Sequence, residues 1–316
     1  MKKYNNSIQP NRLLVKKISI KNSRYCIFTK TVIYLRKNKR RRTMQGIIIG
    51  NISNTYKINT GEKTYEAYAR GRFKNEEITP LVGDKVEIQI TDEEKNVAII
   101  EKIEPRKNEI KRPKMANIDQ IIFIVSTKNP KPDLLMLDKQ LAYVEFLGIE
   151  PIIVINKIDL QDTYKSIQEL YVKVGYKTIV TSAKQGQGIN ELKKELKNKI
   201  SVFSGNSGVG KSSIINAIFG IDKTQEGEIS QKNKKGKNTT TDTKLYELEE
   251  NTYIADTPGF SSFEINEIES TELDKCFREF KQEIQNCEFV RMYSYKREKL
   301  WNKKSYSRWQ NFTRKI

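Results

Sequence analysis

Nine residues decide the fold: Gly205-Asn206-Ser207-Gly208-Val209-Gly210-Lys211-Ser212-Ser213. They fit G-x-x-x-x-G-K-[ST], a loop whose backbone N–H groups surround a phosphate. The apolar run from Ile200 to Phe203 before it indicates a buried strand, and Ile214 to Phe219 after it indicates a helix. That order puts the loop at a helix N-terminus, where anions bind. The stretch predicts a nucleotide-phosphate site, with Lys211 on the β- and γ-phosphates and Ser212 on Mg²⁺.

Charge and composition limit the class of protein. The 316 residues suffice for two or three domains. The net charge of +19 is concentrated at the ends: residues 1–43 hold 14 Lys or Arg and no acid, and residues 287–316 are net +7. Three cysteines and no histidine argue against a disulfide scaffold and favour a reducing compartment. No apolar run reaches the ~18 residues of a membrane span, and the start is a poor secretory signal, so we expect a cytoplasmic protein.

The first 43 residues show no helical or alternating periodicity and end in Arg-Lys-Asn-Lys-Arg-Arg-Arg before Thr43. Three interpretations compete: an arm that binds nucleic acid, an organellar transit peptide, or translated upstream sequence outside the working protein. The character of the chain changes at Met44, where strand-like runs begin.

Five short strands are predicted between residues 44 and 110, at 46–52, 56–59, 64–70, 84–90 and 97–103. Five strands in so short a segment predict a small closed barrel of OB type. Such barrels often bind oligonucleotides, so we expect the barrel to contact RNA, with a purely structural role as the alternative.

From about Asn117 the pattern becomes strand–helix. Strands are predicted at Gln120–Ser126, Pro151–Ile155, Thr178–Thr181, Ile200–Phe203, Thr243–Leu248 and Thr252–Ala255. Helices are predicted at Asp133–Leu147, Tyr164–Val174 and Ile189–Leu196, and Ile214–Phe219 is the apolar part of a fourth helix, which follows the phosphate loop. Continuous apolar strands that alternate with helices predict an α/β domain, a mostly parallel sheet covered on both faces. We expect four parts: 1–43, the barrel at 44–110, the α/β domain at 111–273, and a C-terminal segment at 274–316.

A guanine-binding motif follows the second of these strands. Asn156-Lys157-Ile158-Asp159 has the N-K-x-D form, in which the carboxylate accepts hydrogen bonds from N1–H and the 2-amino group of guanine. Strand ends are where α/β sheets place ligand contacts. Thr181-Ser182-Ala183-Lys184 ends the next strand, and the Ala183 amide would meet the guanine oxygen.

Two further loops are predicted to sense the γ-phosphate. Asp256-Thr257-Pro258-Gly259 follows a strand; Asp256 would hold Mg²⁺ through a water and the Gly259 N–H would contact the γ-phosphate. In the run Asn238-Thr239-Thr240-Thr241, Thr240 is the candidate for contact with Mg²⁺ and the γ-phosphate. We name Asp256–Gly259 switch II and Asn238–Thr241 switch I.

The order of the parts indicates a circular permutation. In Ras-like GTPases the phosphate loop comes first and the guanine-reading loops last. Here the guanine loops precede the phosphate loop, which precedes the switches, as happens when a domain is cut and rejoined elsewhere. Switch II then leads almost directly into the C-terminal segment.

A barrel followed by a permuted GTPase resembles the RsgA family of bacterial GTPases that depend on the small ribosomal subunit. The resemblance runs from Met44 to Cys287 and includes Asn117-Ile118-Asp119-Gln120, Gly148-Ile149-Glu150-Pro151 and Gly227-Glu228-Ile229-Ser230. It implies GTP hydrolysis stimulated by the small (30S) subunit, a role in late maturation of that subunit, contact with its rRNA, and a C-terminal zinc module.

The chain departs from the family in three places. Phe260 stands where Ras-like enzymes have a water-orienting Gln. Asn238 stands where the family usually has a histidine. Of the family's zinc pattern C-x4-C-x-H-x5-C only Cys287 is present; Met292, Ser294 and Leu300 fill the other positions. We hypothesise a one-base frame slip between Cys287 and Met292, with a diverged tail as the alternative.

Two hypotheses follow for the function. The first is a monomeric GTP hydrolase whose nucleotide state times its binding to the small ribosomal subunit and its rRNA. The second is a GTP-binding RNA or ribosome adaptor with little turnover, as Phe260, Asn238 and the incomplete zinc site would allow. An ATP-dependent protein is disfavoured by Asn156–Asp159.

Overall fold

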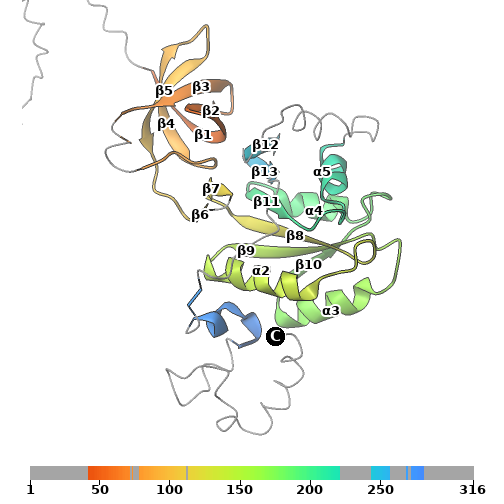
Figure 1. The fold of residues 1–316 in the computed structure, drawn as a ribbon. Coiled ribbons are helices and arrows are strands. Elements are labelled where there is room, and N and C mark those ends of the chain that lie inside the picture. The colour runs from red at the N-terminus through yellow and green to blue at the C-terminus, as the bar shows by residue number, and fades with distance from the viewer. Residues whose placement is uncertain are drawn as a thin grey trace, which may run out of the picture. The chain divides into compact units, whose positions relative to one another are not determined.

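A computed structural model describes residues 42–71, 73, 78–111, 113–220, 243–256, 268–269 and 272–280. Five strands form the first folded part: β1 (Thr43–Ile52), β2 (Thr55–Asn59), β3 (Thr64–Ala69), β4 (Lys85–Asp92) and β5 (Val97–Ile103). They are hydrogen-bonded in the order β1-β2-β3-β5-β4, and β4 pairs back to β1, so the sheet closes (Figure 1). This is the predicted OB-type barrel.

The barrel closes because alternate residues of its strands are apolar. Ile48, Ile58, Ile88 and Ile100 are fully buried, and Tyr65 is 1% exposed. Strand side chains alternate between the two faces of a sheet, so one row from each strand fills the barrel. The pairing of β3 with β5 is parallel and the other pairings within the barrel are antiparallel.

A hairpin that the sequence did not predict follows the barrel: β6 (Glu109–Lys111) and β7 (Lys114–Ala116). An ion pair braces the start of this connection, because the Arg106 guanidinium donates to both carboxylate oxygens of Asp84 at 2.8 and 2.9 Å. Asp84 is fully buried, so Arg106 supplies the partner that its charge requires.

The second folded part has the expected strand–helix alternation. Its elements are β8 (Gln120–Ser126), α2 (Leu134–Phe146), β9 (Glu150–Asn156), α3 (Tyr164–Val174), β10 (Lys177–Val180), α4 (Ile189–Leu196), β11 (Ile200–Ser204), α5 (Lys211–Phe219), β12 (Lys244–Glu249) and β13 (Thr252–Asp256). The strand order is β10-β9-β8-β11-β13-β12, and only β12 runs antiparallel to its neighbour in this part. The expected mostly parallel sheet and the permuted order are both confirmed.

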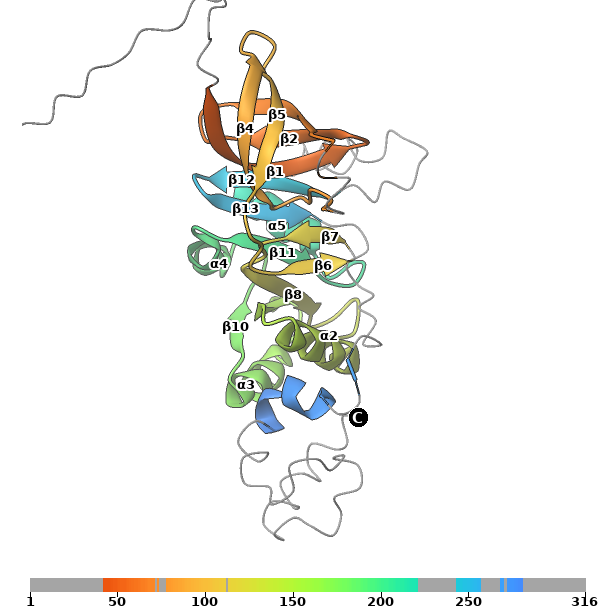
Figure 2. The same cartoon turned by 90° about the vertical axis from the view of Figure 1, so that its left-hand side faces the viewer.

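Two pairs of helices cover opposite faces of this sheet. Leu137, Leu141 and Val144 of α2 and Ile167 and Tyr171 of α3 join one apolar cluster, and α4 and α5 contribute to another with Ile122, Ile124 and Val154 from the alternate face of the strands. Figure 2 shows α2 and α4 on opposite sides of the strands. Burial on both faces explains why β8 and β9 have continuous apolar centres and why every residue of β11 is buried.

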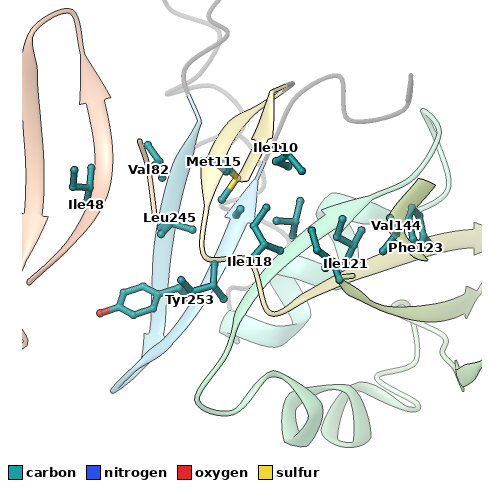
Figure 3. Packing of buried hydrophobic residues seen from close by; sticks show 14 of the residues in the cluster. Ile48, Val82, Ile110, Met115, Ile118, Ile121, Phe123, Val144, Leu245 and Tyr253 are labelled. Atoms are coloured by element: carbon teal, nitrogen blue, oxygen red, sulfur yellow. The ribbon is translucent and has the colours of Figure 1, made fainter. Parts of the chain in front are cut away.

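The first cluster continues past β8. Ile118 and Ile121 pack with Ile110 and Met115 of the hairpin, and Leu245 and Tyr253 belong to the same cluster (Figure 3). The barrel also meets β12, because Gly50 of β1 pairs with Lys244. The strand that follows switch I is therefore hydrogen-bonded to the barrel.

A short element, η3 (Leu273–Cys276), follows the described part of the sheet. Cys276 is buried with Ile268 against Ala142 and Tyr143 of α2. Arg278 holds the segment in place: it pairs with Glu145, donates to the Gly175 carbonyl at 2.8 Å and lies over the Tyr176 ring. The chain after switch II thus returns to α2. The four predicted domain boundaries stay a prediction.

Candidate functional site

The predicted site residues converge because their strands are parallel. β8, β9, β10, β11 and β13 run in the same direction, so their carboxyl ends lie at one edge of the sheet. The guanine motif follows β9, its companion loop follows β10 and the phosphate loop follows β11. Ligand sites of α/β sheets lie at this edge.

The phosphate loop depends on its glycines. Gly208 and Gly210 have φ values of +81° and +98°, the left-handed region that favours glycine. A Cβ on Gly205 would lie 2.8 Å from the Ile124 carbonyl oxygen, so the loop also needs a glycine where it passes β8. The exposed loop residues are Asn206, Ser207, Gly208, Ser212 and Ser213, with Val209 buried beneath them.

Helix α5 begins at Lys211, with Gly210 as its N-cap, and contains the apolar stretch Ile214–Phe219 that indicated it. The first turn of a helix has N–H groups without intrahelical acceptors and the positive end of the helix dipole. The half-buried Lys211 and the exposed Ser212 therefore start the helix at the position where a phosphate would bind.

Asn156 links the guanine motif, its companion loop and the phosphate loop. Its Nδ2 donates to the Val209 carbonyl at 2.9 Å, and its Oδ1 accepts from the Thr181 hydroxyl and the Ala183 N–H, both at 3.2 Å. Asn156 is 1% exposed, and a Cβ on Gly210 would lie 2.2 Å from its Nδ2. The glycine and the asparagine are thus mutually required by this packing.

Lys157 lies along the phosphate loop. Its Nζ donates to the Gly208 carbonyl at 2.6 Å and to the Asn129 carbonyl. Its backbone has φ +64°, an uncommon conformation for a residue with a side chain. Its stem can flank a flat base, and its ammonium ties the guanine loop to the phosphate loop.

Asp159 is oriented by the companion loop. The Ser182 hydroxyl donates to its Oδ1 at 2.7 Å, and the Ile158 N–H donates to the Thr181 carbonyl at 3.3 Å. Ser182 is buried while Asp159 is exposed. An ionised carboxylate has about four acceptor sites, so Asp159 keeps the capacity to bind both N–H donors of a guanine edge.

The structure describes some, but not all, of the residues predicted to hold Mg²⁺. Asp256 ends β13 and pairs in register with Phe203 of β11, two residues before the phosphate loop. Serine and carboxylate oxygens are hard ligands of the kind that Mg²⁺ prefers, so the exposed Ser212 hydroxyl suits that ion, whereas the side chain of Asp256 lies outside the described part of the structure. Thr240, Gly259 and Cys287 lie outside the described residues.

The loop after β8 is a part of the site that sequence reasoning missed. Thr127 donates its hydroxyl to the Lys157 carbonyl at 2.7 Å, and the Ser126 hydroxyl donates to the Pro130 carbonyl at 2.6 Å. The available signal was position alone, because the loop follows a strand next to the one that carries the guanine motif.

Neither a cluster of metal-binding side chains nor a membrane-spanning helix occurs in the part of the chain that the structure describes. Those residues form no group of three or more His, Cys, Asp or Glu side chains able to hold a metal ion. Their helices are too short or too polar to cross a membrane.

Because a phosphate loop and a guanine motif meet at one edge of a sheet whose strands follow a permuted order, the molecule is a circularly permuted GTPase. Residues 103–266 match the family model for the RsgA GTPase, and residues 45–100 match that for the RsgA N-terminal domain. The chain belongs to the RsgA GTPase family.

Individual relatives agree with this assignment. The small ribosomal subunit biogenesis GTPase RsgA of Caldanaerobacter subterraneus subsp. tengcongensis is 40% identical over 248 residues, which cover 78% of this chain and 83% of the relative. That of Ruminiclostridium cellulolyticum is 43% identical over 248 residues, covering 77% and 81%.

Two solved structures have the same fold. YjeQ from Thermotoga maritima matches with a TM-score of 0.65 and 37% identity over 76% of this chain and 84% of that one. YloQ, described as a circularly permuted GTPase, matches with a TM-score of 0.68 and 29% identity over 84% and 88%.

Proposed function

We propose that this chain is a GTP hydrolase that acts in the biogenesis of the small ribosomal subunit. The observation that carries the proposal is the bonding of Asn156 to Val209 of the phosphate loop and to Ala183 of the companion loop. This bonding joins the loops that we propose to bind the base and the phosphates. The relatives named above carry the ribosomal role in their names.

The reaction is the attack of water on the γ-phosphate. Lys211 and the backbone amides from Gly205 to Ser213 offset the charge that builds on the phosphate oxygens. Ser212, Thr240 and Asp256 would hold Mg²⁺, and the Gly259 N–H would contact the γ-phosphate. When bound, Mg²⁺ neutralises charge on the β- and γ-phosphate oxygens.

Guanine specificity is assigned to Asp159, with Ser182 orienting its carboxylate. The Ala183 N–H, which donates to Asn156 Oδ1 in this structure, would have to share that donor with the guanine oxygen or turn to it when the nucleotide binds. An Asp159→Asn variant replaces one acceptor with a donor, so its preference should move from guanine to xanthine nucleotides. Competition of GTP and XTP for a fluorescent nucleotide measures this. Unchanged GTP affinity in the variant would remove the assignment.

Turnover should be slow without a partner, because Phe260 cannot orient a water and Asn238 replaces the family's usual histidine. The same two residues support the second candidate, a GTP-binding adaptor with little turnover. Purified small subunits separate the two functions. Stimulation of phosphate release in the wild type but not in Lys211→Ala supports the hydrolase, and tight GTP binding without stimulation supports the adaptor.

The remaining proposals follow from this role. A factor for the small ribosomal subunit acts in the cytoplasm, and we infer that it binds rRNA as a monomer. Zinc does not fit the residues at hand, since Cys287 is the one zinc-pattern cysteine present and the chain has no histidine. Sequencing the gene tests the frame-slip hypothesis. An uninterrupted reading frame, with no zinc pattern encoded in the shifted frame, would refute it.

A further inference from the structure

The loop from Ser126 to Pro130 contacts Lys157 at two points, the backbone carbonyl and the side-chain ammonium of that lysine. Thr127 binds the backbone end, because its hydroxyl donates to the Lys157 carbonyl at 2.7 Å. Asn129 binds the side-chain end, because its carbonyl accepts from the Lys157 ammonium. No nucleotide-binding motif includes this loop, and its sequence is unremarkable for a segment between a strand and a helix.

Thr127 also binds the residue before Lys157. Its backbone N–H donates to the Asn156 carbonyl at 3.1 Å, so one threonine binds the carbonyls of two consecutive motif residues. Thr127 is 4% exposed, which protects both bonds from water. In a buried setting a hydroxyl–carbonyl bond fixes geometry, because breaking it leaves the carbonyl unsatisfied.

The carbonyl that Thr127 holds also closes the turn that presents Asp159. The Leu160 N–H donates to the Lys157 carbonyl at 3.0 Å, so residues 157–160 form a hydrogen-bonded turn with Asp159 at its third position. Lys157 enters this turn with φ +64°, a conformation that persists only where neighbouring contacts hold it. The Thr127 hydroxyl is one of those contacts.

We propose that Thr127 is a positioning residue for base recognition: its hydroxyl fixes the turn that aims the Asp159 carboxylate at the guanine edge. The inference rests on the proposed guanine site. Thr127 acts through Lys157 and Asp159, and its N–H bond to Asn156 survives a side-chain substitution.

The substitution Thr127→Val tests this role because valine keeps the shape and removes only the hydroxyl. The affinities for GTP and GDP should fall together, about five- to tenfold, since the change lies at the base end. The ratio of GTP affinity to ITP affinity should fall as well. Inosine lacks the 2-amino group that a correctly oriented Asp159 carboxylate would bind, so misorientation of that carboxylate weakens GTP binding more than ITP binding. Thr127→Ser keeps the hydroxyl and should restore both quantities to within about twofold.

Thr252→Val is the matched control. Thr252 is also buried, its hydroxyl accepts from the Asn198 N–H at 3.0 Å, and it starts β13 at the sheet edge opposite the site. This variant should lose stability while its GTP to ITP ratio stays at the wild-type value.

The outcomes are separable. If Thr127→Val keeps wild-type affinity, or loses affinity with an unchanged GTP to ITP ratio, Thr127 is not a positioning residue. If Asp159→Asn leaves base preference unchanged, the guanine assignment itself fails. Two results together support both the guanine site and the role of Thr127: a lower ratio of GTP to ITP affinity in Thr127→Val, and a shift of preference toward xanthine nucleotides in Asp159→Asn.

Discussion

The side-chain amide of Asn156 and the carbonyl of Val209 are joined by a hydrogen bond of 2.9 Å between residues that lie 53 positions apart in the chain. The bond joins the start of the guanine motif to the middle of the phosphate loop. It gives the two loops that are proposed to bind the base and the phosphates a shared support, and the first two predictions below follow from it.

Asn156→Ala should lower GTP affinity by more than about tenfold, because it frees the phosphate loop and the companion loop together and leaves buried groups unpaired. Titration with a fluorescent GTP analogue measures the loss. Gln120→Ala is the control: this equally buried amide bonds to Ser201 and to the Glu195 carbonyl near the opposite sheet edge. It should destabilise the fold and spare binding, whereas equal loss in both variants would contradict the special role of Asn156.

Gly210→Ala should abolish nucleotide binding, since its Cβ would lie 2.2 Å from Asn156 Nδ2 in a backbone with φ +98°. Gly220→Ala, at the other end of α5, has φ +70° and open space around the added carbon. The control variant should therefore lose only about 1 kcal/mol of stability and keep its affinity. Calorimetric GTP titration of both proteins distinguishes a clash from simple backbone strain.

Ser212→Ala should reduce GTP turnover and shift its dependence on Mg²⁺ to higher concentrations, because the hydroxyl is one of the proposed metal ligands. Ser213→Ala removes a hydroxyl from the neighbouring exposed position, where only the backbone N–H is proposed to bind phosphate. It should behave like the wild type in the same Mg²⁺ titration. A Ser212 variant with an unshifted titration would argue against this ligand.

Arg106→Ala should destabilise the protein by about 3 kcal/mol or more, because it leaves the fully buried Asp84 carboxylate without its partner. Lys107→Ala removes an exposed charge that lies 3.2 Å from Asp119 and should cost about 0.5 kcal/mol or less. Urea unfolding compares the two. Similar urea midpoints for the two variants would show that the Arg106–Asp84 ion pair does not stabilise the segment between the barrel and the β6–β7 hairpin.

Alkaline pH should destabilise the fold. Burial, with nearby carboxylates, raises the pKa of Tyr171 and Tyr176 above the usual 10, and raises the pKa of Tyr253 to about 12. Between these values the unfolded chain has lost phenolic protons that the folded chain keeps, so stability falls as pH rises above about 10. Thermal unfolding from pH 8 to 11 measures the decline, which should be shallower in Tyr171→Phe. An identical slope in that variant would count against the buried phenol as a cause.

Apolar runs in the strands and amphipathic periodicity in the helices made most elements predictable. β8, α3 and α4 have the bounds that their periodicity indicated, since each is long enough to be read alone. The strands of the β6–β7 hairpin have three residues each, too few for any alternation to be visible. The pairing of β1 with β12 joins segments far apart in the chain and left no local pattern.

The site divides in the same way. Glycine and lysine spacing predicted a loop between a strand and a helix at residues 205–213, and the structure has that loop, with positive φ at Gly208 and Gly210. Thr127 could not be found from sequence, since a threonine after a buried strand is common and its partner Lys157 is 30 residues away. The Arg278–Glu145 pair, 133 residues apart, was equally invisible.

The permuted order also determines the sequence in which the strands of the sheet are synthesised. β8, β9 and β10 are neighbours in the sheet and consecutive in the chain, so translation delivers the base-reading half before β11 and α5 exist. β11 then inserts beside β8 and β13 follows beside it. The emerging polypeptide can build the support for guanine early, yet it can retain a triphosphate only after the later strands have left the exit tunnel.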